Sequence, residues 1–287
     1  MSFKDWIFSS YPNPSISGQW GLMHILTLVF CVAVIVSVTL IFRNKSEKAR
    51  RIVLWVLTAL ILVFELTRRI VNLIKNTNWD VNSVLHILLP RPWCAISCWM
   101  LMISAIVNKK FFYNFTSPTS LICAIIFFAY PSVGFNNEYI LFENLYSIAT
   151  HSLILITSIL LITLKFTKFE YKNIWKEAIC FAVLLVYVFL EIYVLKIEGD
   201  PMYFMPNNDV MDILSISYGA YLPIYILFML VYFNIFYLID DRKSVKSIFV
   251  RKKKVEILTQ NEEEVENENE KKDVVNKNET EQNNLKQ

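Results

Sequence analysis

The sequence predicts an all-α integral membrane protein, a polytopic bundle of seven transmembrane helices with its N-terminus outside the cell and its C-terminus in the cytosol. Hydrophobic residues make up 55% of the 287 residues, charged residues make up 18%, and the mean hydropathy is +0.42. This exceeds what the core of a soluble protein requires. Lysine and arginine also gather on alternate connections between the apolar segments, and such a bias orients membrane helices.

The apolar segments are mostly close to the ~20 residues that a helix needs to cross ~30 Å of hydrocarbon. The segment at 111–130 is the weakest, because it contains Ser117 and Pro118 and proline interrupts a helix. The first one shows no small-residue cleavage site, so we interpret it as a retained helix rather than a signal peptide. The seven segments cover residues 20–43, 52–74, 93–108, 111–130, 144–164, 174–195 and 216–239.

The connections after the first, third, fifth and seventh segments carry the lysines and arginines. The stretches 131–143 and 198–217 carry none. The positive-inside rule then gives an extracellular N-terminal segment at 1–19, a transmembrane domain at 20–240 and a cytosolic tail at 241–287.

The tail differs from the rest of the chain in composition. From Gln260 onward, Asn, Glu and Lys alternate with almost no apolar residues, so this stretch cannot bury enough surface to fold. Just before it, a basic run could bind anionic lipid headgroups, or it could serve only as a topology signal. The run consists of Arg251, Lys252, Lys253 and Lys254.

Cys94 has the most specific setting among the polar residues. It follows Pro90-Arg91-Pro92-Trp93, and proline is favoured in the first turn of a helix. A thiol there meets unpaired N–H groups and the positive end of the helix dipole, and Arg91 adds a cation, so the thiolate is favoured. The same N–H groups could hold an oxyanion. The alternative is that Cys94 only fills space in the membrane, which is the stronger interpretation for Cys98.

Four polar residues in four different segments lie at a similar distance from a basic anchor. Each lies 14 or 15 residues along the chain from a lysine or arginine at the basic end of its segment. This separation corresponds to roughly 21–23 Å along a helix. Polar groups at one depth in a bilayer are a functional site by default. The four are Glu65, Cys94, His151 and Glu191.

Each of the other three has two possible roles. His151 could act as a general base toward Cys94 or could only link two helices by a hydrogen bond. Glu65 has the i,i+3 and i,i+4 spacing of ion pairs with Arg68 and Arg69. Glu191 has no such partner, so it could pair across the bundle or orient His151.

His86, like His24, lies toward the outer side and could support the site. These histidines do not have i,i+4 ligand spacing, and the five cysteines form no CxxC pair. We therefore expect no metal and no other cofactor. We expect membrane lipids as partners and no nucleic acid.

Several runs of this sequence resemble those of YwaF-like bacterial membrane proteins, which belong with the vertebrate transmembrane protein 164 family of seven-helix proteins. The likeness covers about residues 18–240. Cys94 ends a run similar to the family's Leu-Pro-Leu-His-Leu-Cys, and His151-Ser152-Leu153 resembles its His-Gly-Leu. The residues Asp200 to Phe204 loosely resemble its Asn-Tyr-Met-Tyr-Leu, and Pro223-Ile224-Tyr225 resembles its Pro-x-Tyr.

This resemblance implies a bacterial plasma-membrane protein with a role in lipid metabolism. The vertebrate members are regarded as phospholipid acyltransferases that use a Cys and a His through an acyl-thioester, and those positions correspond to Cys94 and His151. Tyr203, Asp200 and Tyr225 then become candidate substrate-binding residues. The alternative functions are a non-enzymatic transporter or lipid-binding protein and a purely structural partner.

Overall fold

The structure of the protein is a computed structural model that describes residues 6–7, 20–77, 79–129, 135, 141–196, 202–203, 206, 208, 211 and 214–241. Asp200, the basic run and the Asn- and Glu-rich tail lie outside these residues. The described part is helical and contains no strand. The chain divides into two units, residues 1–233 and 234–287, and the helices discussed below belong to the first, except for the last turns of α10.

Two long helices begin the bundle, α2 (Leu22–Phe42) and α3 (Glu47–Lys75). The side chain of Ser46 accepts a hydrogen bond from the Ala49 N–H and so caps the start of α3. α2 carries no Asp, Glu, Lys or Arg and buries little of its surface. Such a helix needs an apolar solvent around it.

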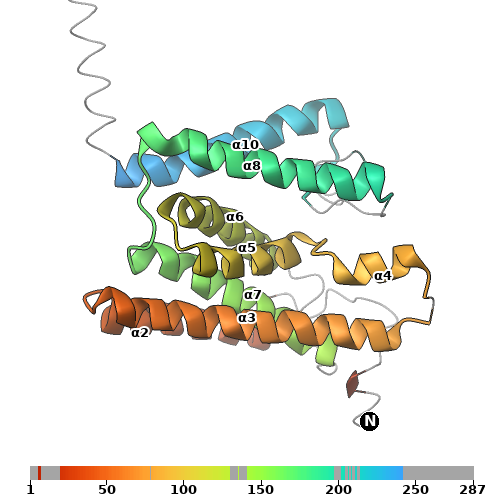
Figure 1. Cartoon of the computed structure of the whole chain (residues 1–287), viewed down its shortest axis with the longest axis horizontal. Coiled ribbons are helices and arrows are strands. Elements are labelled where there is room, and N and C mark those ends of the chain that lie inside the picture. Colours follow the sequence, from red (N-terminus) through yellow and green to blue (C-terminus); the bar gives the residue numbers. More distant parts are fainter. Residues whose placement is uncertain are drawn as a thin grey trace, which may run out of the picture. The chain divides into compact units, whose positions relative to one another are not determined.

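A broken pair of helices follows, α4 (Val81–Leu88) and α5 (Trp93–Val107), with an angle of 57° between them (Figure 1). The break falls at Leu89 to Pro92, where Pro90 and Pro92 cannot donate backbone hydrogen bonds. From the sequence we expected only a connection between the segments 52–74 and 93–108, so α4 was not predicted.

Helix α6 (Lys110–Ala129) runs without interruption through Pro118, contrary to our expectation of a break there. Hydrogen bonds near Pro118 connect α6 to two other helices. The Ser117 hydroxyl donates to the Ser158 carbonyl at 2.8 Å, and the Tyr232 hydroxyl donates to the Pro118 carbonyl at 2.9 Å. Both contacts join α6 to other helices close to the proline.

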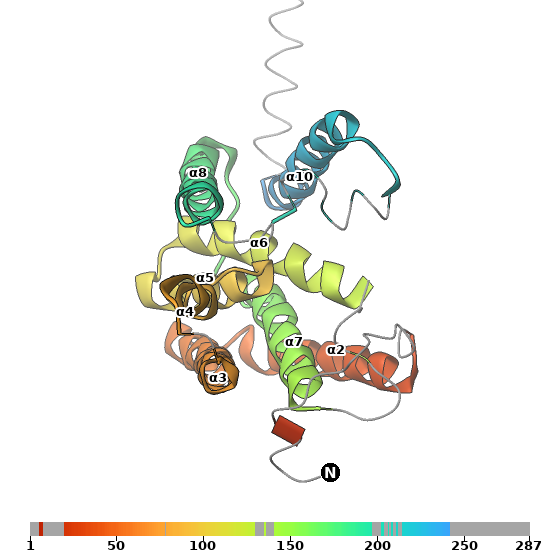
Figure 2. The same cartoon turned by 90° about the vertical axis from the view of Figure 1, so that its right-hand side faces the viewer.

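Helix α7 (Phe142–Thr163) packs against α2, α3, α5 and α6 (Figure 2). Its buried apolar side chains join those of these four helices in the larger hydrophobic core. A helix with so many neighbours places its side chains inside the bundle, and His151 is one of those buried side chains.

The remaining helices form a second apolar cluster with one face of α5 and α6. They are α8 (Ile174–Phe189), which continues through the short 3-10 turn η2 (Tyr171–Asn173) before it and the π-helical turn η3 (Leu190–Val194) after it, and α10 (Tyr218–Asp240). The cluster contains Trp93, Leu184, Val188, Met202 and Met229.

Within the residues that the structure describes, length and composition identify five helices that can each cross a membrane, or six if the bent pair α4 and α5 is one span. α3 does not count among the five although it has 29 residues. It carries Glu65, Arg68 and Arg69 in its second half, and these charges set it apart from the other long helices. The chain is thus a multipass membrane protein, as expected.

Candidate functional site

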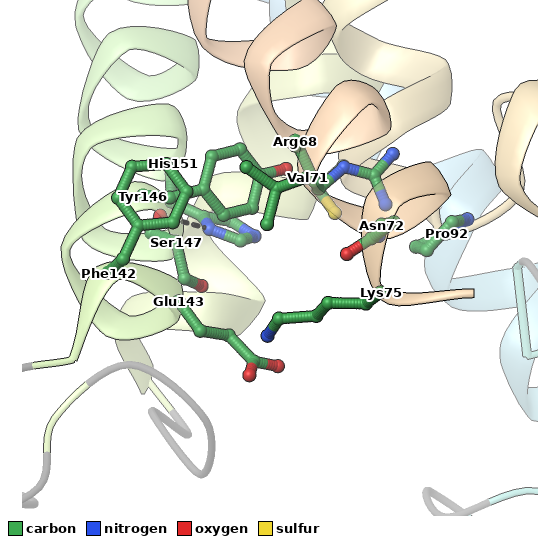
Figure 3. Close-up of a pocket in the computed structure, with 11 residues that line it drawn as sticks. Arg68, Val71, Asn72, Lys75, Pro92, Phe142, Glu143, Tyr146, Ser147 and His151 are labelled. Carbon is green, nitrogen blue, oxygen red and sulfur yellow. Dashed lines mark hydrogen bonds between the residues drawn. The ribbon is translucent and has the colours of Figure 1, made fainter. Parts of the chain in front are cut away.

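A pocket of about 250 Å³ lies between α3, the start of α5 and the first half of α7 (Figure 3). Cys94 and His151, the two residues that the sequence singled out for chemistry, both line it. The lining residues are Arg68, Val71, Asn72, Lys75, Pro92, Cys94, Phe142, Glu143, Tyr146, Ser147 and His151.

Cys94 is the second residue of α5, which follows the N-cap Pro92. The first helical hydrogen bond of α5 is made by the Ile96 N–H to the Pro92 carbonyl at 3.0 Å. The N–H groups of Trp93, Cys94 and Ala95 therefore have no acceptor inside the helix. The sequence predicted this first-turn position, and the structure confirms it.

His151 is held in a defined orientation. Its Nδ1 lies 2.7 Å from the Ser147 carbonyl oxygen, one turn earlier in α7. Because a carbonyl only accepts, Nδ1 carries the proton and Nε2 of the neutral ring keeps its lone pair. The ring stacks on Phe127 with centroids 3.6 Å apart and planes 6° apart. A fixed imidazole with a free lone pair facing a pocket has the geometry of a general base.

Glu65 is buried and pairs with both neighbouring arginines, as its spacing predicted. Its Oε1 lies 2.9 Å from Nη2 of Arg68 and 2.6 Å from Nη2 of Arg69. Arg69 also donates to the carbonyls of Ile87 and Leu88 at the end of α4. Glu65 does not line the pocket itself, but it holds Arg68, which does.

The sequence analysis did not identify Arg68, Lys75 or Tyr146 as site residues. Arg68, Val71, Asn72 and Lys75 follow the i, i+3, i+4, i+7 spacing of one helix face. This spacing was the available signal, because three of the four residues are polar or charged inside an otherwise apolar segment.

Arg91 and Glu191 lie elsewhere. Both are buried, their charges interact, and neither lines the pocket. Glu191 accepts a hydrogen bond from the Tyr187 hydroxyl at 2.6 Å. The contact that orients His151 in the structure comes from the Ser147 carbonyl.

The candidate substrate-binding tyrosines also lie outside the pocket lining. The Tyr225 hydroxyl donates to the Met202 carbonyl at 3.0 Å, and Tyr203 lies beside Trp93 with ring centroids 6.5 Å apart. Trp93 precedes Cys94 and belongs to the second cluster. His86 is an exposed residue of α4.

No three His, Cys, Asp or Glu side chains of the described ranges lie together as a metal site would require.

Comparison with known families gives a match over residues 17–240 to the TMEM164 family. The chain belongs to the TMEM164 family. No curated protein and no solved structure matched it. The part of the chain shared with the TMEM164 family contains every residue that lines the pocket and all the helices described above.

Proposed function

We propose that this TMEM164-family protein is a phospholipid acyltransferase that works through an acyl-thioester on Cys94. The observation that carries the proposal is the pocket that Cys94 and His151 share. A thiol and an oriented neutral imidazole in one pocket are the minimal components of an activated sulfur nucleophile.

The reaction would run in two steps. His151 Nε2 takes the thiol proton, and the sulfur attacks an acyl ester carbonyl of a lipid; the bond between the acyl carbon and the lipid oxygen breaks, and that oxygen takes the proton from His151. In the second step an acceptor hydroxyl gives its proton to His151 and attacks the thioester, and the thiolate leaves and takes that proton back from His151. The unpaired N–H groups at the start of α5 support the developing oxyanion.

The wider proposal keeps the topology expected from the sequence. α3 serves as a seventh span because Glu65 pairs with both arginines and Arg69 caps α4, so its charges are compensated inside the bundle. The N-terminus would lie outside and the C-terminus in the cytosol of a bacterial plasma membrane, and the chain would group with the YwaF-like members. Arg251 to Lys254 would bind anionic headgroups.

The test is intact-mass analysis of the purified protein. We expect an added mass equal to one acyl chain on Cys94, and hydroxylamine should remove it because it cleaves thioesters. Protein that never carries such a mass after incubation with membrane lipids contradicts the proposal.

A second candidate function is a transporter or lipid-binding protein without chemistry. The break between α4 and α5 favours it, because broken helices recur at the binding sites of transporters. In that case the lipid would bind reversibly and Cys94 would carry no covalent adduct.

A further inference from the structure

Within its described part, the protein binds only one of the two edges of the Arg68 guanidinium. One edge binds Glu65, with Nε 3.2 Å from Oε2 and Nη2 2.9 Å from Oε1. Nη1 makes no hydrogen bond to any residue that the structure describes. An arginine fork with one free edge is suited to a second anion.

The charges around Glu65 leave an excess on the side of the pocket. Arg69 is satisfied by Glu65, by the carbonyls of Ile87 and Leu88 and by the Trp99 ring, 5.6 Å from its guanidinium carbon. One carboxylate shared by two guanidinium groups leaves one net positive charge. Because Arg69 is turned toward the end of α4, that charge faces the pocket through Arg68.

The position of Arg68 is fixed from both sides. Glu65 holds one edge, and the Tyr146 ring lies 5.8 Å from its guanidinium carbon. Its side chain is 20% exposed, so the charge is largely shielded from bulk water and interacts strongly with charges nearby. Cys94 and Arg68 line the same pocket, so the thiol and this charge share one shielded space.

We propose that Arg68 is a further catalytic residue, whose free Nη1 edge holds the negative charge on the Cys94 sulfur and then on the substrate oxygen. This inference rests on the acyl transfer proposed above. As the sulfur bonds to the acyl carbon, the carbonyl electron pair moves onto oxygen, where the Arg68 N–H groups stabilise it until the lipid oxygen leaves. From the sequence we expected Arg91 to supply the cation that favours the Cys94 thiolate, but Arg91 lies outside the pocket lining.

Reagent charge provides the test on the unaltered protein. For Cys94, the alkylation rate with anionic iodoacetate is divided by the rate with neutral iodoacetamide, each resolved by site with mass spectrometry. The ratio is compared with that of N-acetylcysteine amide, a free thiol without a charge of its own. A retained positive charge predicts a ratio several-fold above the free thiol. A ratio equal to or below the free thiol overturns the proposal.

Variants identify the source of the charge. Arg68→Gln should slow iodoacetamide alkylation of Cys94 at neutral pH by roughly tenfold or more, and the deficit should shrink at alkaline pH, where the thiolate forms without help. Arg68→Lys keeps the charge but loses the fork that binds Glu65 and the anion together, so it should slow alkylation less than Arg68→Gln does. The other titratable or charged groups near Cys94 or in the pocket lining are Glu65, Lys75, Cys98, Cys123, Glu143, Tyr146 and His151, and all are unchanged in both variants.

Cys98 is the internal control, because it is buried one turn further along α5. Its labelling in Arg68→Gln would mean that this variant has unfolded. Lys75→Gln removes the other cation of the pocket and so tests whether Lys75 supplies the charge. The ratio of the iodoacetate rate to the iodoacetamide rate should stay raised in this variant. Loss of the raised ratio in Lys75→Gln would overturn the proposal. An unchanged pH profile of Cys94 alkylation in folded Arg68→Gln would overturn it as well.

Failure of this proposal and failure of the proposed function can be told apart. If no acyl adduct forms while alkylation depends on Arg68, the acyl transfer fails and the anion site stands. If an acyl adduct forms while the alkylation rate does not depend on Arg68, the acyl transfer stands and the anion site fails.

Discussion

His151 shows how a single residue gains a chemical role from two neighbours that are themselves chemically inert. The Ser147 carbonyl fixes the proton on Nδ1, and Phe127 fixes the plane of the ring. Neither contact satisfies Nε2. A histidine that only linked two helices would instead use both nitrogens within the bundle, because unpaired polar atoms are costly in a membrane.

We expect His151→Ala to slow acyl transfer by roughly 10²- to 10⁴-fold, the loss typical of a missing general base. Transfer of a labelled acyl chain in detergent measures this. His24→Ala is the matched control, since His24 is also buried in the bundle but lies outside the pocket lining. It should keep the parent rate. Equal rates in His151→Ala and the parent would remove the base from the mechanism.

At the scale of elements, α3 links the pocket to the α4–α5 break. Arg68 and Arg69 are consecutive residues, so their side chains point in different directions around the helix. One lines the pocket and the other caps α4, and Glu65 binds both. The position of the start of α5, and so of Cys94, depends on this ion-pair cluster.

Glu65→Gln should lower the free energy of unfolding by about 3–5 kcal/mol, because it leaves a buried guanidinium without its carboxylate. Unfolding of the purified protein in mixed detergent micelles measures the change. The matched control is Glu143→Gln, which alters an exposed carboxylate and should shift stability by no more than about 0.5 kcal/mol. Similar losses in both variants would refute a structural role for the cluster.

The start of α4 provides a pH-dependent prediction. The Ser83 N–H, at 2.9 Å, and then the Ser83 hydroxyl donate to Asp80 and hold the pKa of its carboxyl below the usual value. A lowered pKa means that the carboxylate stabilises the folded state above its unfolded pKa of ~3.9, and that this contribution disappears as the pH falls through the folded value.

We therefore expect the amide protection factors of Ser83 and Val84, measured by hydrogen exchange, to fall as the pH drops below ~3.9. Asp80→Ala should show the low protection already at neutral pH, whereas Asp80→Asn should retain the cap. Full protection at neutral pH in Asp80→Ala would show that the cap does not hold α4.

At the scale of the whole molecule, α7 brings the pocket into the bundle. It contacts four other helices, while large apolar side chains remain exposed along α2, α8 and α10. Exposed apolar faces around a polar interior are the arrangement that a bilayer requires.

Topology can be tested with reporter fusions. Reporters after Lys48, Lys168 or Lys254 should lie in the cytosol, and reporters after Asn137 or Asn207 should lie outside, because lysine and arginine favour the cytosolic side. Protease accessibility in intact cells and in inverted vesicles distinguishes the two. A reporter after Asn137 found in the cytosol would contradict the seven-span topology.

The seven apolar segments could be predicted because each is long and apolar, and each is helical in the structure. α4 was missed because it has only eight residues and ends beside two prolines. The common depth of four polar residues was a one-dimensional measure. It selected Cys94 and His151, which line one pocket, together with Glu191, which does not line it. Depth alone could not separate them, because it does not fix the direction in which a side chain points around its helix.

Arg68 was missed for a related reason. Its spacing from Glu65 predicted an ion pair, and the structure confirms it. What the spacing could not show is that the pair uses one edge of the guanidinium and that Arg68 also lines the pocket, because the lining depends on how α3 packs against α5 and α7.

The central claim is the covalent role of Cys94, and labelling with a lipid-derived acyl chain tests it most directly. The parent protein and Cys98→Ser should both take up the label in a form that hydroxylamine removes, whereas Cys94→Ser should take up none and should keep the thermal stability of the parent, because serine differs from cysteine by one atom. Equal labelling of Cys94→Ser and the parent would show that Cys94 is only a packing residue and would favour the transporter or lipid-binding function.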